Sequence, residues 1–487
     1  MPTALNNYRT LSSPTRYFSL WIIIGWGIVL FLLKNRIGLI FTHIPIDYNE
    51  GWNAYWAERA IGLVQAPLYP NPQNSLIFNN YPPLSFYIVG WIGYFLGDMV
   101  FAGRIVALCA WLLTGYFIFR LIQKAGGDKI SAHSGSLLFL IYSSYFFRDY
   151  IAMDDPQWLG HAFMLGGLMF LLPASQLSPL RVVIAAALFI IGGLVKHNLL
   201  ALPFAVTCWL FLRDKKLALL WVTTGVVGIL LSILCFITLY HNNFMLEDIL
   251  HHKRVLELGR IHKAVGRLAI FLTLILVSSA FFHCKENRYR NRDNLQILFG
   301  IFTVLSLINA FIESLGDGVS YNAFFESLVA LSITVGLALS LYIQSPTAFY
   351  KLILLTLLPV IIMIPSYLPG ILKEEHLIKA ESPQWNALIT RLKEKRTPVI
   401  CNIAEICYWA GKSYQLDFFN FQQAMRRGAS SLPLEQKLTA SPHVSIVDIK
   451  LPLKAKRKAP PRPIWQIILA HPHKTEKLSP DVTVITL

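Results

Sequence analysis

Long apolar blocks are the feature that most restricts the fold of this chain. Each comes near or reaches the length of about 20 residues with which a helix crosses a bilayer. The clearest blocks are 17–33, 100–122, 217–240, 268–282, 294–312 and 327–343. Of the 487 residues, 55% are hydrophobic and only 14% are charged, whereas a soluble protein carries about 25% charged residues. We therefore predict a polytopic α-helical membrane protein.

The Lys and Arg residues between the blocks predict how the chain threads the membrane, because cytoplasmic loops are enriched in them. Arg9 and Arg16 precede the first block, and this block lacks a small-residue cleavage site. We therefore predict that it is a membrane span and not a signal peptide that is removed. With the N-terminus inside, about 11 crossings place the C-terminus outside. The expected spans are 17–40, 100–122, 131–147, 157–173, 182–195, 198–212, 217–240, 266–283, 294–312, 322–343 and 352–370.

The first outer loop, 41–99, contains a second type of apolar segment. Residues 82–97 are apolar but short and begin with Pro82-Pro83, so we expect an interfacial or re-entrant helix. The predicted outer loop 241–265 is rich in basic residues. Such residues normally mark cytoplasmic loops, so membrane topology does not explain this cluster. That cluster is a candidate anion site. The rest of the net charge of +16 is explained by basic residues in short loops that fix the membrane orientation. We therefore expect the chain to contact membrane lipid and not to bind nucleic acid.

The apolar blocks stop at residue 370, which divides the chain into a transmembrane domain, 1–370, and a soluble α/β domain, 371–487, on the outer side. The expected strands are 398–401, 444–449, 465–469 and 482–487, and the expected helices are 385–395 and 418–427. Cys401 and Cys407 can pair in an oxidising compartment. The sequence does not fix their separation, so their redox state stays open.

Acidic and basic residues collect in the loops of the predicted outer face. Ionisable groups at a membrane boundary are costly and are functional candidates for that reason. A carboxylate can act as a general base toward a hydroxyl or an amine. Lys and Arg can bind a phosphate and stabilise it as it leaves. The candidates of these two kinds are Asp47, Glu50, Asp154, Asp155, Lys196, Arg254 and Arg260.

Structural roles remain open for the same residues. Asp47 or Glu50 can cap a short helix, and Asp154-Asp155-Pro156 can begin the helix that follows. Lys196 can extend its side chain toward the interface without binding anything. Aromatic residues such as Trp52 and Tyr81 can stack on sugars, but they are also common at membrane interfaces.

Four stretches resemble the GT-C superfamily of glycosyltransferases. They are DYNEG at 47–51, NYPPL at 80–84, GVSYNAFFE at 318–326 and the tail 398–428. The similar branch contains protein O-mannosyltransferases, the lipid A aminoarabinose transferase and lipopolysaccharide-core glycosyltransferases that use polyprenyl-phosphate sugars. The architecture of one span, an acidic loop, many spans and a small outer domain agrees with this branch.

The resemblance implies an inverting displacement in which a carboxylate of the first outer loop deprotonates the acceptor and polyprenyl phosphate leaves. The family often has Asp-Glu where this chain has Asn49-Glu50, so the base is either Asp47 or Glu50. Lys196, Arg254 and Arg260 are expected to bind the donor phosphate. The residues expected to bind substrate are Tyr81, Asp154, Asp155 and Asn322. Relatives differ in metal dependence, so a divalent cation remains open.

We expect transfer of a sugar from a polyprenyl-phosphate donor to a lipid, glycan or protein acceptor at the outer face of a membrane, with the bacterial inner membrane as the expected location. The main alternative is a transporter or flippase of a lipid-linked glycan, a class that is marked by discontinuous helices and charges within spans. An O-antigen ligase or polymerase and a non-catalytic scaffold are further alternatives. The sequence leaves the sugar, the acceptor and the oligomeric state open.

Overall fold

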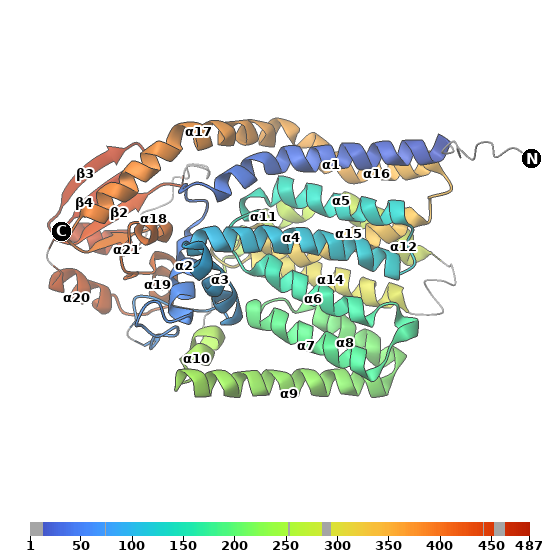
Figure 1. The fold of residues 1–487 in the computed structure, drawn as a ribbon, viewed down its shortest axis with the longest axis horizontal. Helices are drawn as coiled ribbons and strands as arrows, with labels where there is room; N and C mark the ends of the chain where they lie inside the picture. The colour runs from blue at the N-terminus through green and yellow to red at the C-terminus, as the bar shows by residue number, and fades with distance from the viewer. Residues whose placement is uncertain (1–12, 74, 252–253, 285–293, 442, 452–462) are drawn as a thin grey trace, which may run out of the picture.

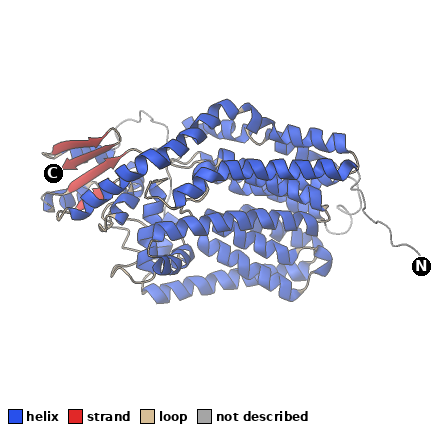
Figure 2. Cartoon of the chain, turned by 45° about the horizontal axis from the view of Figure 1, so that its top comes forward, coloured by secondary structure: helices blue, strands red, loops and turns tan. Residues whose placement is uncertain are grey.

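The computed structural model describes residues 13–487 except 74, 252–253, 285–293, 442 and 452–462. A bundle of long helices makes up most of the molecule, and a small sheet lies beyond one end of it (Figures 1 and 2). We call this the domain end of the bundle. The first described residues, at the start of α1, lie at the other end (Figure 1).

The bundle is formed by helices that match the expected spans, either singly or as bent pairs. They are α1 (Ser13–Ile40), α4 (Met99–Lys124), α5 (Lys129–Phe146), α6 (Gln157–Leu171), α7 (Pro179–Val195), α8 (Ala201–Arg213), α9 (Lys215–Tyr240), α11 (Ile261–Ala269), α12 (Leu272–His283), α14 (Leu295–Ser314), α15 (Phe325–Ser340), α16 (Pro346–Ile362) and α17 (Ile364–Glu394). Every residue of α15 is buried, so this helix forms the centre of the bundle. It packs against α5, α12 and α14.

Five helices of the described chain are long and apolar enough to cross a membrane. The number rises to seven if two bent segments, with bends of 59° and 64°, each count as one span. The helices α3 (Leu84–Leu96), α7 and α8 are apolar but shorter. These apolar helices identify the chain as an integral membrane protein. The number of about 11 crossings stays a prediction.

Basic side chains gather at the end of the bundle opposite the sheet. Lys124 donates to the carbonyls of Met169 and Leu172 at 3.1 and 2.9 Å, and Arg213 donates to the carbonyl of Ala174 at 2.8 Å. These contacts close the turn between α6 and α7. Cationic loops at this end are the arrangement that the positive-inside rule expects of a cytoplasmic face.

Short helices cover the domain end. Helix α2 (Tyr48–Ala60) follows Asp47, and α3 begins after Pro83 and ends at Gly97, whose φ is 81°. With 13 residues and a rise of about 1.5 Å per residue, α3 is shorter than the hydrocarbon core. Its position agrees with the short helix expected over 82–97. Helix α10 (Phe244–His251) lies beside the end of α9 (Figure 1).

The C-terminal part is a mixed α/β unit, as expected. Its strands are β1 (Val399–Cys401), β2 (Ser445–Ile449), β3 (Lys474–Ser479) and β4 (Val482–Thr486), in the order β1-β2-β4-β3. The first pair is parallel and the other two are antiparallel. Its helices are α18 (Ala404–Trp409), α19 (Phe418–Arg426), α20 (Leu432–Ala440) and α21 (Pro463–Ala470). Cys401 and Cys407 form a disulfide.

The secondary structure of this part differs from the expected elements at two segments. The strand expected over 465–469 is wrong, because these residues lie in α21, where Ile464 and Ile468 are buried one helical turn apart. Strand β3 was not expected, because its exposed polar sequence KTEKLS carries no hydrophobic alternation. Helix α17 continues without interruption across residue 370, and the division of the chain into two domains at 370 stays a prediction.

Candidate functional site

Acidic and cationic residues from distant segments meet at the domain end around the side chain of Tyr48. Arg254 and Tyr48 both contact the ring of Phe419, at 5.3 and 5.2 Å from its centre, and Asp47 directly precedes Tyr48. Tyr81 also lies near enough to influence the ionisation of Tyr48. Lys196 joins them through Tyr81, because its ammonium lies 3.5 Å above the centre of the Tyr81 ring. We call Asp47, Tyr48, Tyr81, Lys196 and Arg254 the Tyr48 cluster. The structure thus brings together the first-loop acid and two of the expected phosphate ligands.

The two candidate bases have different surroundings. Asp47 is the N-cap of α2 and accepts a hydrogen bond from the backbone N–H of Asn49 at 3.2 Å. Glu50 is fully buried and forms a bidentate pair with Arg104, with N–O distances of 2.8 and 2.7 Å. Glu50 also accepts from the backbone N–H groups of Ile46 and Asp154. Its carboxylate is therefore neutralised and occupied by protein donors.

Besides pairing with Glu50, Arg104 also holds the beginning of the first loop in place. Its remaining donors bind the carbonyls of Leu39, Thr42 and Ile44 at 2.7 to 2.8 Å. The end of α1, the start of α2 and α4 are thereby joined by one buried guanidinium. Arg104 is 1% exposed, so this arrangement is part of the core rather than of an open surface.

Lys196 and Arg254 are the cations of the Tyr48 cluster. Lys196 follows the last turn of α7 and is 3% exposed. Among the described residues, no carboxylate lies within ion-pairing distance of its ammonium. Arg254 donates to the carbonyl of Asp317 at 3.1 Å, and its guanidinium carbon lies 5.3 Å above the ring of Phe419. Both cations also act electrostatically on Glu313 at the end of α14.

Arg260, the third expected phosphate ligand, contacts the same loop as Arg254, and its expected role stays a prediction. Its guanidinium donates to the carbonyls of Gly316 and Val319, and it lies 3.6 Å from the carboxylate of Asp317. Arg267 donates to the same Val319 carbonyl at 3.2 Å. These contacts hold the loop between α14 and η4 (Tyr321–Phe324). In the described residues Arg260 is thus occupied by this loop.

Asn322 connects η4 to the beginning of α6. Its side-chain oxygen accepts from Tyr150 at 3.3 Å, and its backbone carbonyl accepts from Gln157 at 2.8 Å. The side-chain amide of Asn322 donates back to Gln157 at 3.3 Å. These contacts orient η4 relative to the start of α6. The expected role of Asn322 in substrate binding stays a prediction.

Asp154 and Asp155 are buried in the turn before α6. Each is 3% exposed. A Cβ atom at Gly103 would lie 2.0 Å from the carboxyl carbon of Asp154, so this carboxylate rests directly on the backbone of α4. Their expected contact with substrate stays a prediction. In the described residues no group of three or more His, Cys, Asp or Glu side chains is arranged to hold a metal ion.

The C-terminal unit supplies side chains that the sequence did not indicate. The ring of Phe419 lies 5.2 Å from that of Tyr48. Asp417 caps α19 and accepts a hydrogen bond from the indole of Trp52 at 3.1 Å. Burial raises the pKa of Asp417 to about 6. Helix α19 therefore closes over the Tyr48 cluster, and the only sequence signal was its place in the tail that resembles GT-C enzymes.

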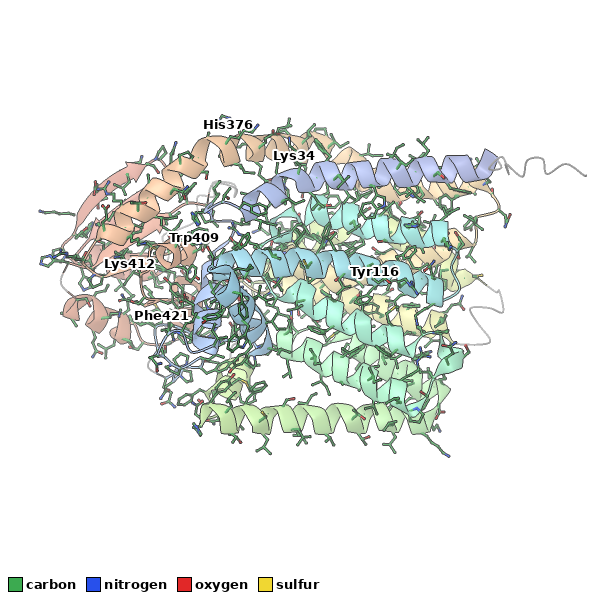
Figure 3. The ribbon with its side chains drawn as sticks, viewed as in Figure 1. Lys34, Tyr116, His376, Trp409, Lys412 and Phe421 are labelled. Atoms are coloured by element: carbon green, nitrogen blue, oxygen red, sulfur yellow. A yellow bond between two sulfur atoms is a disulfide. The ribbon has the colours of Figure 1, made fainter. Side chains whose placement is uncertain are left out.

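Backbone contact and ion pairs fix the C-terminal unit on the bundle. A Cβ atom at Gly51 of α2 would lie 1.9 Å from the backbone nitrogen of Glu405 in α18. Tyr55 donates to the carbonyl of Lys412 at 2.5 Å, and Figure 3 shows Trp409, Lys412 and Phe421 where the two parts meet. Arg426 pairs with Asp317 and Glu257 at 2.5 and 2.6 Å. These ion pairs join α19 to the loops that carry Arg254.

The fold is shared with solved GT-C membrane enzymes. Over 96% of this chain and 98% of theirs, it superposes on ArnT from Cupriavidus metallidurans in the apo state (TM-score 0.64, 11% identity) and bound to undecaprenyl phosphate (0.60, 12%). It also resembles the apo oligosaccharyltransferase of Archaeoglobus fulgidus, with a TM-score of 0.51 and 13% identity over 89% of this chain and 70% of that one. No family model and no curated protein sequence matches. The fold that the sequence resemblance implies is therefore confirmed.

Proposed function

We propose that this protein is a membrane glycosyltransferase that moves a sugar from a polyprenyl-phosphate donor to a lipid, glycan or protein acceptor. The observation that carries the proposal is the Tyr48 cluster, in which a carboxylate and two cations from three distant segments lie at the domain end, the cations against the rings of Tyr81 and Phe419. The fold shared with an enzyme that has been solved with undecaprenyl phosphate supports a lipid-linked donor.

Lys196 and Arg254 bind the donor phosphate. The Lys196 ammonium is almost fully buried and contacts an aromatic face, so an anion that arrives beside it replaces lost hydration with a counter-charge. Arg254 adds planar N–H donors, which suit the oxygens of a phosphate. Two positive charges at this point stabilise the negative charge that grows on the phosphate as it leaves.

Asp47 acts as the general base. Asp47 lies at the start of α2, directly before Tyr48, and therefore on the same side of the site as the two cations, whereas the Glu50 carboxylate binds Arg104 and two backbone N–H groups. Asp47 accepts the proton of the acceptor hydroxyl or amine, and the freed electron pair attacks the anomeric carbon. The bond from this carbon to the phosphate oxygen breaks, its electron pair stays on polyprenyl phosphate, and the sugar configuration inverts.

The proposed location is the inner membrane of a bacterium, with the Tyr48 cluster and the C-terminal unit outside. The cationic side chains at the opposite end of the bundle support this orientation. The disulfide in the C-terminal unit supports an oxidising compartment at the domain end.

The test uses the full-length protein in detergent with a panel of short-chain polyprenyl-phosphate sugars. Release of polyprenyl phosphate in the presence of an acceptor extract is expected for the wild type. Asp47→Asn and Lys196→Met should each reduce it at least 100-fold, whereas the surface controls Glu394→Gln and Lys379→Met should retain it. If vesicles instead carry the intact lipid-linked sugar across the membrane without cleavage, the protein is a flippase and the proposal fails.

A further inference from the structure

A carboxylate is tied to the turn that carries Lys196. Glu313 lies in the last turn of α14, and both of its oxygens accept from the side-chain amide of Asn198, at 3.2 and 3.4 Å. A second amide, that of Asn309 one turn earlier in α14, donates to Glu313 at 3.3 Å. Asn198 follows Lys196 by two residues between α7 and α8. Glu313 therefore contacts the segment that positions the Lys196 ammonium.

The segment that carries Arg254 runs beside the residues that follow Glu313. Two backbone hydrogen bonds of 2.9 and 3.0 Å pair residues 255–257 antiparallel with residues 315–317. Arg254 itself donates to the carbonyl of Asp317 at 3.1 Å. Both cations of the Tyr48 cluster are near enough to act on Glu313 electrostatically. One carboxylate is thus shared by the two segments that supply the phosphate ligands.

The other carboxylates near this turn have charged or backbone partners of their own. Glu326 accepts from two backbone N–H groups at the start of α8, at 3.4 Å each. The carboxylate of Asp317 pairs with Arg426 at 2.5 Å and lies 3.6 Å from Arg260. In the described residues Glu313 accepts hydrogen bonds only from neutral amides. Its charge is therefore the one that acts on the two cations from outside an ion pair.

The charges around the turn determine how strongly it holds a phosphate. Lys196 and Arg254 contribute two positive charges. Burial and these two cations lower the pKa of His197 to about 4, so its ring adds no charge at neutral pH. Hydrogen bonds from the two amides favour the ionised form of Glu313. Its negative charge repels an incoming phosphate, because charges in a partly buried site are only weakly screened.

The leaving group of the proposed reaction carries more charge than the donor. The phosphate of a polyprenyl-phosphate sugar is a diester with one negative charge, whereas polyprenyl phosphate is a monoester with about 1.5 to 2 at neutral pH. Two cations alone would hold this product more tightly than the next donor. A fixed negative charge beside them opposes the product more than the donor, because the repulsion is proportional to the charge it acts on.

We propose that Glu313 is the counter-charge of the phosphate site and promotes release of polyprenyl phosphate after transfer. The inference rests on the proposed function, because it concerns the same two cations. Glu313 takes no part in the bonds that form and break. It acts on the phosphate through Lys196 and Arg254 and is a positioning residue in this sense.

A purely structural role of Glu313 predicts the opposite effect on affinity. In that role the carboxylate only anchors Asn198 and the turn of Lys196, so its loss would loosen Lys196 and weaken phosphate binding. Removal of a counter-charge instead strengthens the binding of an anion. The sign of the change in product affinity therefore separates the two roles.

The experiment uses full-length protein in detergent at pH 7.5 and constant ionic strength. Calorimetric titration measures the Kd of a short-chain polyprenyl phosphate, and steady-state kinetics measure KM and kcat for the sugar-linked donor. Glu313→Gln keeps an acceptor oxygen for Asn198 and removes the charge. It should lower the Kd of polyprenyl phosphate roughly fivefold or more, lower the donor KM by a smaller factor, and strengthen product inhibition.

Two controls separate charge from structure. Glu394→Gln removes an exposed carboxylate in the last turn of α17 and should leave both affinities unchanged. Asn198→Ala removes the tie between Glu313 and the turn but keeps the charge, so it should weaken the binding of product and donor together.

A product affinity that Glu313→Gln leaves unchanged or weakens would overturn the inference, as would an equal gain for product and donor. The wild type alone decides the matter if the variant fails to fold. Its Kd for polyprenyl phosphate should lie within roughly tenfold of that for a donor analogue that cannot be cleaved, and a tighter product would contradict the levelling role of Glu313. A wild type that neither binds polyprenyl phosphate nor cleaves any donor would count against the proposed function instead.

Discussion

The ammonium of Lys196 lies 3.5 Å above the centre of the Tyr81 ring. Tyr81 itself is held by the indole of Trp52, 4.9 Å away between ring centres, and its backbone carbonyl accepts from Tyr69 at 2.8 Å. The aromatic face thus fixes a buried cation at the end of α7. In the proposed reaction this contact positions the donor phosphate.

Tyr81→Leu should weaken donor binding more than catalysis. A cation–π contact of this kind is worth about 0.5–2 kcal/mol, which corresponds to roughly a 2- to 30-fold increase in the KM for the polyprenyl-phosphate sugar. Tyr81→Phe keeps the ring face and should stay within about twofold of the wild type. Steady-state kinetics with varied donor separate KM from kcat, and an equal loss in both variants would show that the hydroxyl group matters instead.

Glu50→Gln should destabilise the protein, whereas Asp47→Asn should not. Removing one partner of a buried ion pair costs about 3–5 kcal/mol because the other charge is left unpaired, and Arg104 is 1% exposed. Asn at position 47 can still cap α2. Thermal unfolding in detergent should show a clear loss for Glu50→Gln and little change for Asp47→Asn. A stable and inactive Glu50→Gln protein would return Glu50 to the role of base.

Arg426→Ala should loosen α19 without unfolding the bundle. Its pairs with Asp317 and Glu257 are partly exposed, and such pairs contribute about 0–1 kcal/mol each. We expect a small change in Tm, faster amide exchange in α19 and a higher KM for the donor, because this helix carries Phe419 against Arg254. Arg391→Ala removes an exposed pair with Glu476 elsewhere and serves as the control that should leave exchange in α19 unchanged.

Asp417 should make stability depend on pH in a defined direction. Burial raises its pKa to about 6 in the folded protein, above the value of about 3.9 in an unfolded chain. Its contribution to stability is therefore complete below about pH 4 and is lost as the pH rises through about 6. The Tm of the wild type should fall from pH 5 to pH 7.5 by about 2 °C or more relative to Asp417→Asn. Parallel curves for the two proteins would contradict this assignment.

The sequence determined the membrane character, the positions of the long helices and the short helix over 82–97, because these depend on local hydrophobic length. Local pattern also predicted an α/β unit after the last apolar block. The prediction from local pattern was wrong at α21, because a short apolar run is equally typical of a strand. It also missed β3, because the exposed sequence of this strand has no hydrophobic alternation. Both errors arise where short segments take their structure from tertiary packing.

Only the tertiary structure shows that Asp47 and Glu50 have different surroundings. Both lie in one acidic stretch, and nothing local reveals that Arg104 from α4 neutralises Glu50. The burial of Asp154 against α4 and the contact of Phe419 with the Tyr48 cluster also join residues that are far apart in the chain. Helix formation depends on neighbours along the sequence, whereas the charge state and accessibility of a side chain depend on whatever packs against it, and that is settled only when the helices come together.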